Sequence, residues 1–353
     1  MTEILIIIVV GLLGITFWQM SKILKLSQSG KKDDNGVATD ADNKTQGKLM
    51  LWFAVLFYAF MIYNFWDYSK FYLPEAASKH GVDYDRLMML SILIIVIVQI
   101  VTQFLLHYFS FKYKGRKGQK ALFFADNDKL EAVWTIIPVI VLAALIIYGL
   151  FTWSDIMNFD EDEDAVVVEL YAYQFGWKAR YAGADNTLGK ANVRFIKGIN
   201  TLGLDESDPY AADDKITTEL HLPVNKRVIF KFRSQDILHS AYFPFFRAQM
   251  NVVPGMITQF SFVPTITSDE MRNSKYMVDK VKEINEIRAE NSKELVAKGE
   301  MPLDPYEFDY YVLCNKICGI SHYNMQMKII VEEEEDFQAW LAQQQEFGES
   351  IKQ

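Results

Sequence analysis

The chain has 353 residues, half of them hydrophobic, and a formal net charge of −9. This length allows two or more domains, and the negative charge argues against a nucleic-acid partner, because phosphate backbones are bound by basic surfaces. Long uncharged apolar runs occupy the N-terminal part, and only short apolar runs follow them. The composition therefore predicts a membrane anchor followed by a separate domain.

Four apolar stretches, each free of acidic and basic residues, are long enough to cross a bilayer, which takes ~17–25 residues. They are residues 4–20, 49–66, 87–108 and 132–153. The first could instead be a secretion signal, but residues 1–3 lack the positive charge of such signals. A retained helix is favoured, so four transmembrane helices are predicted.

Basic residues in the loops predict the orientation of these spans. Six lysines lie between the first and second spans, and six basic residues lie between the third and fourth. The loop between the second and third spans has only Lys70, Lys79 and Arg86. Because basic loops stay in the cytoplasm, everything after the fourth span is predicted to be extracytoplasmic.

After the anchor, short runs rich in β-branched and aromatic residues alternate with turn signals, at 165–171, 228–232, 257–263 and 327–331. This pattern is typical of a small β-sandwich or barrel. The predicted organisation has three parts: 1–48, the first transmembrane helix and a cytoplasmic linker without a fold (21–48); 49–159, three further transmembrane helices; and 160–353, an extracytoplasmic domain with a charged helical insertion at 267–300.

The chemistry concentrates in one loop, where Cys314 and Cys318, the only cysteines, precede His322 and Met325. Sulfur and imidazole ligands suit copper, and a single electron-transfer copper needs only one thiolate. A second thiolate suggests two bridged coppers. A disulfide and a structural zinc site are the alternatives, although neither needs the methionine. His239, directly after the apolar run 228–232, is the candidate for a second imidazole.

Three features in this order, the D-x-x-H-S motif at 236–240, the Pro254-Gly255 turn and the C-x-x-x-C-x-x-x-H-x-x-M loop, resemble subunit II of the haem-copper cytochrome c oxidases. The resemblance implies an all-β, cupredoxin-like Greek-key domain with a dinuclear CuA centre. It also implies the ligands: bridging Cys314 and Cys318, terminal His239 and His322, axial Met325, and the backbone carbonyl of Lys316 as the opposite axial ligand.

Three more positions take expected roles from the resemblance. Phe175 stands where the family usually has a tryptophan that receives electrons from cytochrome c, with Trp177 as an alternative and a buried aromatic cluster as a third reading. Glu131, in the family's N-x-x-L-E-x-x-W-T-x-x-P segment, is expected at the mouth of a proton-uptake pathway, or else it only marks the helix start. Lys316 replaces a glutamate that commonly binds magnesium or manganese beside subunit I, which argues against that metal here.

The function that the resemblance implies is electron entry into an aerobic respiratory oxidase. The chain would accept electrons from cytochrome c and pass them to subunit I, whose haem-copper site reduces oxygen to water while protons are pumped. The haems would lie only in that partner. Further expected partners are subunit III, membrane lipid and a larger respiratory supercomplex, and the expected location is the bacterial plasma membrane. A copper-free quinol oxidase subunit, the copper domain of a nitrous oxide reductase and a copper-delivery module are the competing hypotheses.

Overall fold

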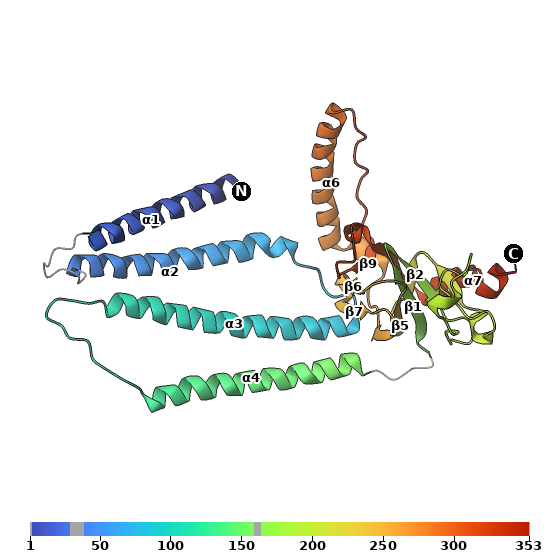
Figure 1. Cartoon of the computed structure of the whole chain (residues 1–353), viewed down its shortest axis with the longest axis horizontal. Helices are drawn as coiled ribbons and strands as arrows, with labels where there is room; N and C mark the ends of the chain where they lie inside the picture. The colour runs from blue at the N-terminus through green and yellow to red at the C-terminus, as the bar shows by residue number, and fades with distance from the viewer. Residues whose placement is uncertain (1, 29–38, 159–163, 353) are drawn as a thin grey trace. The chain divides into compact units, whose positions relative to one another are not determined.

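A computed structural model describes residues 2–28, 39–158 and 164–352 (Figure 1). The chain divides into two compact units, one made of Met1–Phe65 and Gln99–Ala125, the other of Trp66–Val98 and Asp126–Gln353. The predicted domain boundary at 159/160 and residues 29–38 of the predicted linker lie outside the described residues.

Four helices form the anchor: α1 (Thr2–Gln28), α2 (Asp40–Tyr68), α3 (Lys79–Lys112) and α4 (Asp128–Met157). Among the described residues, three helical stretches are long and apolar enough to cross a membrane: Asp40–Phe71, Lys79–Lys112 and Asp128–Met157. α1 contributes a shorter apolar segment, Val9–Ile23. The predicted helical anchor is therefore confirmed, with three long apolar helices and a shorter apolar segment within α1.

α1 extends into the segment for which no fold was predicted, and α2 begins inside it, so that prediction is wrong for residues 21–28 and 40–48. The start of α2 lies among polar residues. This start is capped: the Asp42 amide donates to Thr39 Oγ1 at 3.2 Å, and the Thr39 amide donates to Asp42 Oδ2 at 3.3 Å. Such reciprocal bonds satisfy amides that the first helical turn leaves unpaired. With this start fixed, the polar residues before the membrane span continue its helix.

The second unit carries two five-stranded sheets. The first has the order β3 (Lys215–Thr217), β2 (Gly176–Tyr181), β1 (Val166–Tyr173), β5 (Val228–Ser234) and β8 (Thr258–Phe262). The second has the order β4 (Leu220–Pro223), β10 (Gln326–Glu332), β9 (Tyr310–Cys314), β6 (His239–Phe243) and β7 (Ala248–Val252). The four predicted strands correspond to β1, β5, β8 and β10, and the predicted all-β, cupredoxin-like class is confirmed.

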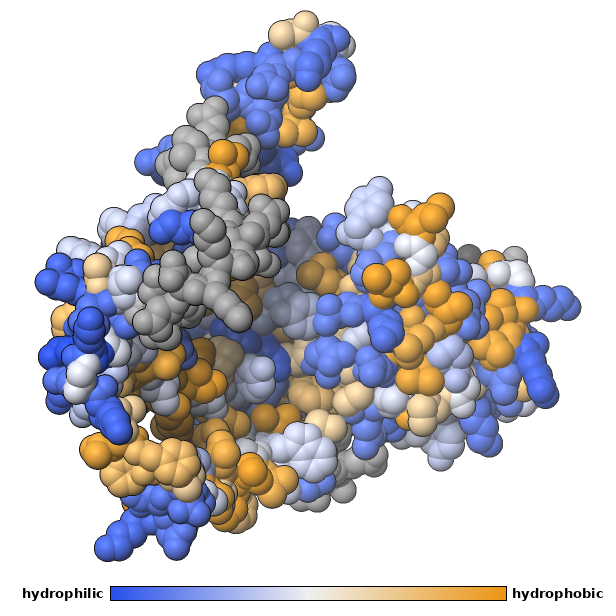
Figure 2. Space-filling model, turned by 60° about the vertical axis from the view of Figure 1, so that its left-hand side comes forward, coloured by the Kyte–Doolittle hydropathy of each residue, from blue (hydrophilic) through white to orange (hydrophobic). Residues whose placement is uncertain are grey.

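Short helices complete the β domain: α5 (Ser268–Asn273), α7 (Glu334–Ala342), α8 (Phe347–Ser350) and the 3₁₀ turns η4 (Pro244–Phe246) and η5 (His322–Asn324). The charged insertion contains a long helix, α6 (Lys275–Ala297). It is the projection at the top of Figure 2, where its surface is mainly hydrophilic.

The main core lies between the two sheets. Leu170 on β1 pairs in register with Phe232 on the parallel strand β5, and both side chains are fully buried. From the other sheet, Val312 and Ile329 are buried in the same core. Because alternate residues of a strand face opposite sides, one apolar row from each sheet is enough to build this layer.

The outer face of β1 is also covered, and it carries charge. Glu169 accepts hydrogen bonds from Arg233 at 2.7 and 3.1 Å and lies 3.3 Å from Arg180, which is also 3.3 Å from Asp214. Burial opposes ionisation of Glu169, but the two arginines outweigh it and hold its pKa below the usual value. Burial opposes ionisation of Asp214 as well, and since Arg180 is its one cationic partner among the described residues, burial prevails and raises its pKa to about 7.

This cluster predicts a pH-dependent stability. The raised pKa means that the native state holds a proton on Asp214 that the unfolded chain, with a carboxyl pKa near 3.8, has released. Stability should therefore be lost as pH rises from about 4 to about 7. Relative to wild type, Asp214→Asn should gain stability over pH 5 to 7, measured as urea midpoints by near-ultraviolet circular dichroism. The exposed control Asp279→Asn should keep a constant offset, and a constant offset for Asp214→Asn would contradict the assignment.

The β domain holds the start of α3 through backbone and ionic contacts. The Ala77 amide donates to the Phe245 carbonyl at 2.8 Å, and the Lys79 amide donates to the Val263 carbonyl at 3.0 Å. Arg247 donates two hydrogen bonds to the Asp85 carboxylate, at 2.9 and 3.0 Å. These bonds fix the outer end of one membrane helix to the sheets.

Candidate metal centre

Two segments distant in the sequence, β6 and the stretch formed by β9 and the loop after it, meet at one end of the second sheet. β6 begins at His239 and β9 ends at Cys314, and the two strands pair with Ala241 opposite Cys314. The loop after β9 then returns, so that the Cys314 amide donates to the Met325 carbonyl at 3.0 Å. Strand pairing therefore delivers one imidazole and one sulfur, and the loop delivers the remaining donors.

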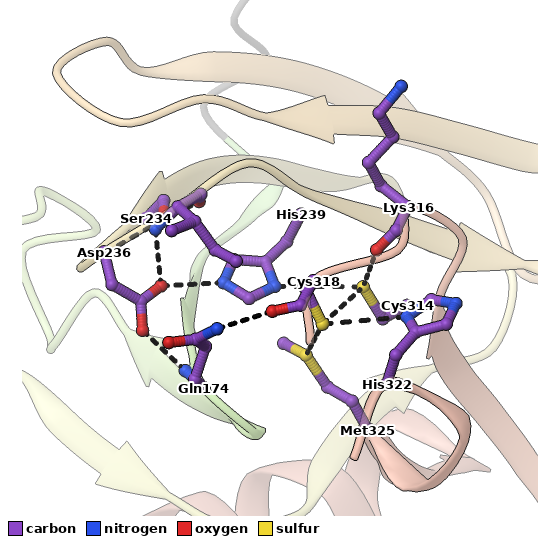
Figure 3. Close-up of polar contacts among 10 residues, drawn as sticks. Gln174, Ser234, Asp236, His239, Cys314, Lys316, Cys318, His322 and Met325 are labelled. Atoms are coloured by element: carbon purple, nitrogen blue, oxygen red, sulfur yellow. Dashed lines mark hydrogen bonds and ion pairs between the residues drawn. The ribbon is translucent and has the colours of Figure 1, made fainter. Parts of the chain in front are cut away.

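The donor atoms lie close together (Figure 3). The two sulfurs of Cys314 and Cys318 are 3.8 Å apart. His239 Nδ1 lies 3.8 Å from the Cys314 sulfur, and His322 Nδ1 lies 3.6 Å from the Cys318 sulfur. The Met325 sulfur is 3.7 Å from Cys318. The structure thus brings together all five side chains that the sequence singled out as ligands.

These spacings fit a metal better than a disulfide. A disulfide requires a sulfur separation of about 2.05 Å, and both cysteines are free thiols in the structure. Two ligands that bind one first-row metal at ~2.3 Å can be no more than about 4.6 Å apart. The sulfur–sulfur and sulfur–nitrogen distances all satisfy that limit. Two thiolates with imidazole and thioether donors suit copper.

The backbone oxygen of Lys316 lies 3.2 Å from the Cys314 sulfur, whereas its side chain points away from the sulfurs (Figure 3). The two ends of the sulfur pair therefore differ. A carbonyl and His239 lie beside Cys314, and a thioether and His322 lie beside Cys318. This arrangement offers each of two metals one imidazole and one weaker donor.

The protonation of the two thiols also differs. Burial opposes the Cys314 thiolate, but hydrogen bonding with His239 and contacts with the Lys316 and Ser240 backbone outweigh it and lower its pKa to about 6. Burial and the neighbouring Cys314 sulfur raise the pKa of Cys318 to about 11. Metal binding requires both sulfurs as thiolates, so the copper affinity of this pair should fall as pH decreases.

A carboxylate orients the first imidazole. His239 Nε2 lies 2.8 Å from Asp236 Oδ1. The backbone N–H of Gln174 donates to Asp236 Oδ2 at 2.7 Å. Burial opposes ionisation of Asp236, but the bonds from His239, Gln174 and Ile237 outweigh it and lower its pKa. A carboxylate on the distal nitrogen leaves Nδ1 of His239 facing the sulfurs as a donor atom.

Replacing Asp236 should therefore weaken metal binding without removing a ligand. For Asp236→Asn we expect copper affinity to fall by roughly 10–100-fold, the usual effect of losing such a partner. Competition with a copper chelator measures the affinity. Asp279→Asn, an exposed change on α6, is the matched control and should bind as wild type does. Equal affinity in both variants would show that Asp236 has no orienting role.

Sequence reasoning included Asp236 in a motif but gave it no role, and it missed Gln174. The Gln174 side-chain amide donates to the Cys318 carbonyl and so holds the loop from β1 (Figure 3). Its position immediately before Phe175 carries no metal-ligand signal. Only the fold brings this residue, 144 positions away in sequence, to the loop.

Three other residues were given roles from the sequence, Phe175, Trp177 and Glu131, and they lie at different distances from the metal-donor atoms. Trp177 is buried, with its ring centroid 6.3 Å from that of His239. Phe175 is half-buried against the loop, where a Cβ added at Gly319 would lie 2.8 Å from its ring. Glu131 lies in the first turn of α4, far along the chain from this site. Their predicted roles in electron entry and proton uptake stay predictions.

A helical anchor, a cupredoxin-like domain and a cluster of two thiols and an imidazole that could hold a metal together define a membrane-anchored β-domain protein. Residues 67–151 match the family profile "Cytochrome C oxidase subunit II, transmembrane domain". The "Alternative cytochrome c oxidase subunit 2" of Bradyrhizobium diazoefficiens is 33% identical over 68% of this chain and 73% of its own length. This chain belongs to the cytochrome c oxidase subunit II family.

The chain is also similar to a further curated relative and to a solved structure. The "Cytochrome c oxidase subunit 2" of Cereibacter sphaeroides is 26% identical over 71% of this chain and 73% of its own length. Among solved structures, the periplasmic domain of subunit II of cytochrome oxidase (CoxB) of Bradyrhizobium japonicum is 17% identical, covers 51% of this chain and 94% of its own, and has a TM-score of 0.29. The profile match includes α3 and most of α4 but not α1.

Proposed function

We propose that this chain is the electron-entry subunit of a respiratory oxidase and that the site holds a dinuclear CuA centre. The observation that carries the proposal is the sulfur pair at 3.8 Å with an imidazole beside each sulfur. Copper bound there would supply a one-electron redox centre between a c-type cytochrome and the haems of subunit I. The proposed ligands are His239, Cys314, the Lys316 carbonyl, Cys318, His322 and Met325.

The chain's own residues would make this centre compact and dry. Cys318, Met325 and His239 are almost completely buried, at 2%, 1% and 0% exposure. A buried site changes little in solvation when its charge changes, which favours rapid electron transfer. Strand pairing and the Asp236 contact hold the ligands in place before any metal arrives.

The loop that carries the donors also presents an apolar rim. Ile317, Ile320 and Tyr323 are 85%, 91% and 87% exposed. Large apolar side chains exposed together mark surfaces that contact other proteins. We assign this rim to contacts with subunit I or the cytochrome c donor, with Phe175 as the aromatic electron entry and Trp177 as its alternative.

The proposal includes the wider complex. Subunit I would hold the haems and the oxygen-reducing site, with proton pumping through a pathway that Glu131 enters. Subunit III and a larger supercomplex are further proposed partners, and the proposed location is a bacterial plasma membrane. Lys316 offers a cation in place of the carboxylate that an interfacial magnesium or manganese would need, so no such metal is proposed. The complete donor set also disfavours a copper-free quinol oxidase subunit.

Rapid mixing of the purified oxidase with a reduced c-type cytochrome tests the order of electron flow. The account expects the absorbance of this domain's copper to change before that of the haems. In Met325→Leu, which removes the thioether while keeping similar volume, the rate and potential of that first step should shift while the haem spectra stay unchanged. Direct reduction of the haems before the copper would contradict the proposal.

A further inference from the structure

A cavity of about 430 Å³ lies where the start of α3 and the end of α4 meet β8, within one compact unit. It is placed at the outer ends of two membrane helices, which is the depth of lipid headgroups. Its walls carry charges of both signs: Lys79 and Arg227 on one hand, Asp83 and Asp155 on the other. Neither the metal centre nor any proposed role above uses these residues.

The charged groups are available to a ligand. Arg227 donates to the Ser261 hydroxyl at 2.9 Å and has no carboxylate partner among the described residues. Among the described residues, the side chains of Lys79 and Asp155 also form no ion pair. Asp83 pairs with Arg86, whose Nη1 lies 3.1 Å from its carboxylate. Two cations without carboxylate partners suit a phosphate, and two carboxylates suit an ammonium group.

An apolar groove continues from this cavity along the same two helices. It has a volume of about 300 Å³ and lies between Leu90 and Ile94 on α3 and Ile140 to Tyr148 on α4. Leu90 follows Lys79 by about 16 Å of helix at ~1.5 Å per residue, so the groove lies at acyl-chain depth. Tyr148 lines both the cavity and the groove. Tyrosine favours this boundary because its ring is apolar and its hydroxyl is polar.

We propose that the cavity and the groove bind one phospholipid of the phosphatidylethanolamine class. Lys79 and Arg227 receive the phosphate, and Asp83 and Asp155 receive the ammonium group. The groove receives part of one acyl chain. A phosphatidylglycerol headgroup would offer the same phosphate but no ammonium group for Asp83 and Asp155, and Asp155 has no other cationic partner among the described residues, so the site prefers ethanolamine lipids.

The test uses the full chain purified with its partner subunits and placed in nanodiscs containing equal amounts of dioleoyl phosphatidylethanolamine and dioleoyl phosphatidylglycerol. Native mass spectrometry then counts the lipids retained. Wild type should retain one ethanolamine lipid in preference to phosphatidylglycerol by about ten-fold, as expected for hydrogen bonds to a charged group. The absence of any preference would overturn the proposal without use of a variant. The absence of retained lipid, as when a neighbouring subunit fills the cavity, would overturn it as well.

Double variants separate the contributions of the two cationic and the two acidic residues to lipid binding. Lys79→Gln with Arg227→Gln should lose both lipids, because the phosphate is common to them. Asp83→Asn with Asp155→Asn should keep a lipid but lose the preference, and a preserved preference would contradict the assignment. The control Asp128→Asn with Lys129→Gln changes the same residue types at the other end of α4 and should behave as wild type.

Two further experiments test whether the apolar groove binds an acyl chain. Ala144→Phe fills the groove and should lower retention of both lipids equally. Glycerophosphoethanolamine, which has the headgroup without the acyl chains, should not displace the bound lipid at equal concentration. Displacement by this soluble compound would show that the ligand is a free phosphate ester and not a membrane lipid.

Discussion

Replacing Cys318 with serine should reduce the copper held by this chain in the purified oxidase from about two ions to about one or none, while the copper of subunit I stays unchanged. The side chain is 2% exposed and lies within 3.8 Å of three other donor atoms, so no other sulfur can take its place. Electron transfer from reduced cytochrome c should fall by roughly 100-fold or more, since a ligand matters more than the groups that orient it. Metal analysis and stopped-flow spectroscopy measure the two effects.

Serine is close to cysteine in size, so the loop should still fold. The matched control is Asn315→Ser, which introduces the same residue at an exposed position of the same loop and should leave copper and activity unchanged. If Cys318→Ser kept its full copper content, the bridging role of this sulfur would be wrong.

Replacing Arg180 with methionine should destabilise the β domain by about 3–5 kcal/mol, the usual cost of breaking a buried ion pair from one side. Arg180 is 1% exposed, and its loss would leave Glu169 with Arg233 as its ion-pair partner and Asp214 with no ion-pair partner among the described residues. The free energy of unfolding in urea at pH 7 measures the effect. Arg194→Met, an exposed arginine-to-methionine change, should cost less than about 0.5 kcal/mol.

The charge explanation can be separated from lost packing. If the cost comes from uncompensated carboxylates, adding Glu169→Gln and Asp214→Asn to Arg180→Met should recover part of the stability, because neutral groups are cheaper to bury. A triple variant that is less stable than Arg180→Met alone would show that packing and hydrogen bonds dominate.

Much of this structure could be predicted, because the spacing of apolar residues in a segment depends directly on whether that segment crosses a membrane or packs against a core. Long uncharged runs predicted the membrane helices, and β-branched runs predicted β1, β5, β8 and β10. The strands that carry the site were missed: β6 and β9 are short, and their polar or aromatic residues give no regular alternation. β6 pairs with β7 and β9, and β9 pairs with β10, so these strands depend on tertiary pairing more than on local pattern.

The metal site, too, could be predicted from the sequence only in part. Its soft donors share one loop, so their spacing predicted a metal centre, and a motif located His239. The Gln174 contacts and the buried cluster around Arg180 join residues that are close only after folding. Asp236 is only three positions from His239, but residue type and spacing gave no sign that its carboxylate would bind the imidazole. The length of α2 was underestimated because a polar sequence after a cap still forms helix when an apolar helix follows it.

The central claim is that two thiolates jointly hold two coppers in this domain. Electron paramagnetic resonance of the purified, oxidised protein, combined with copper analysis of the same sample, tests it most directly. The account predicts two coppers per chain and a spectrum in which one unpaired electron couples equally to both nuclei. A single copper with an electron localised on one nucleus, or a Cys314–Cys318 disulfide without metal, would contradict it.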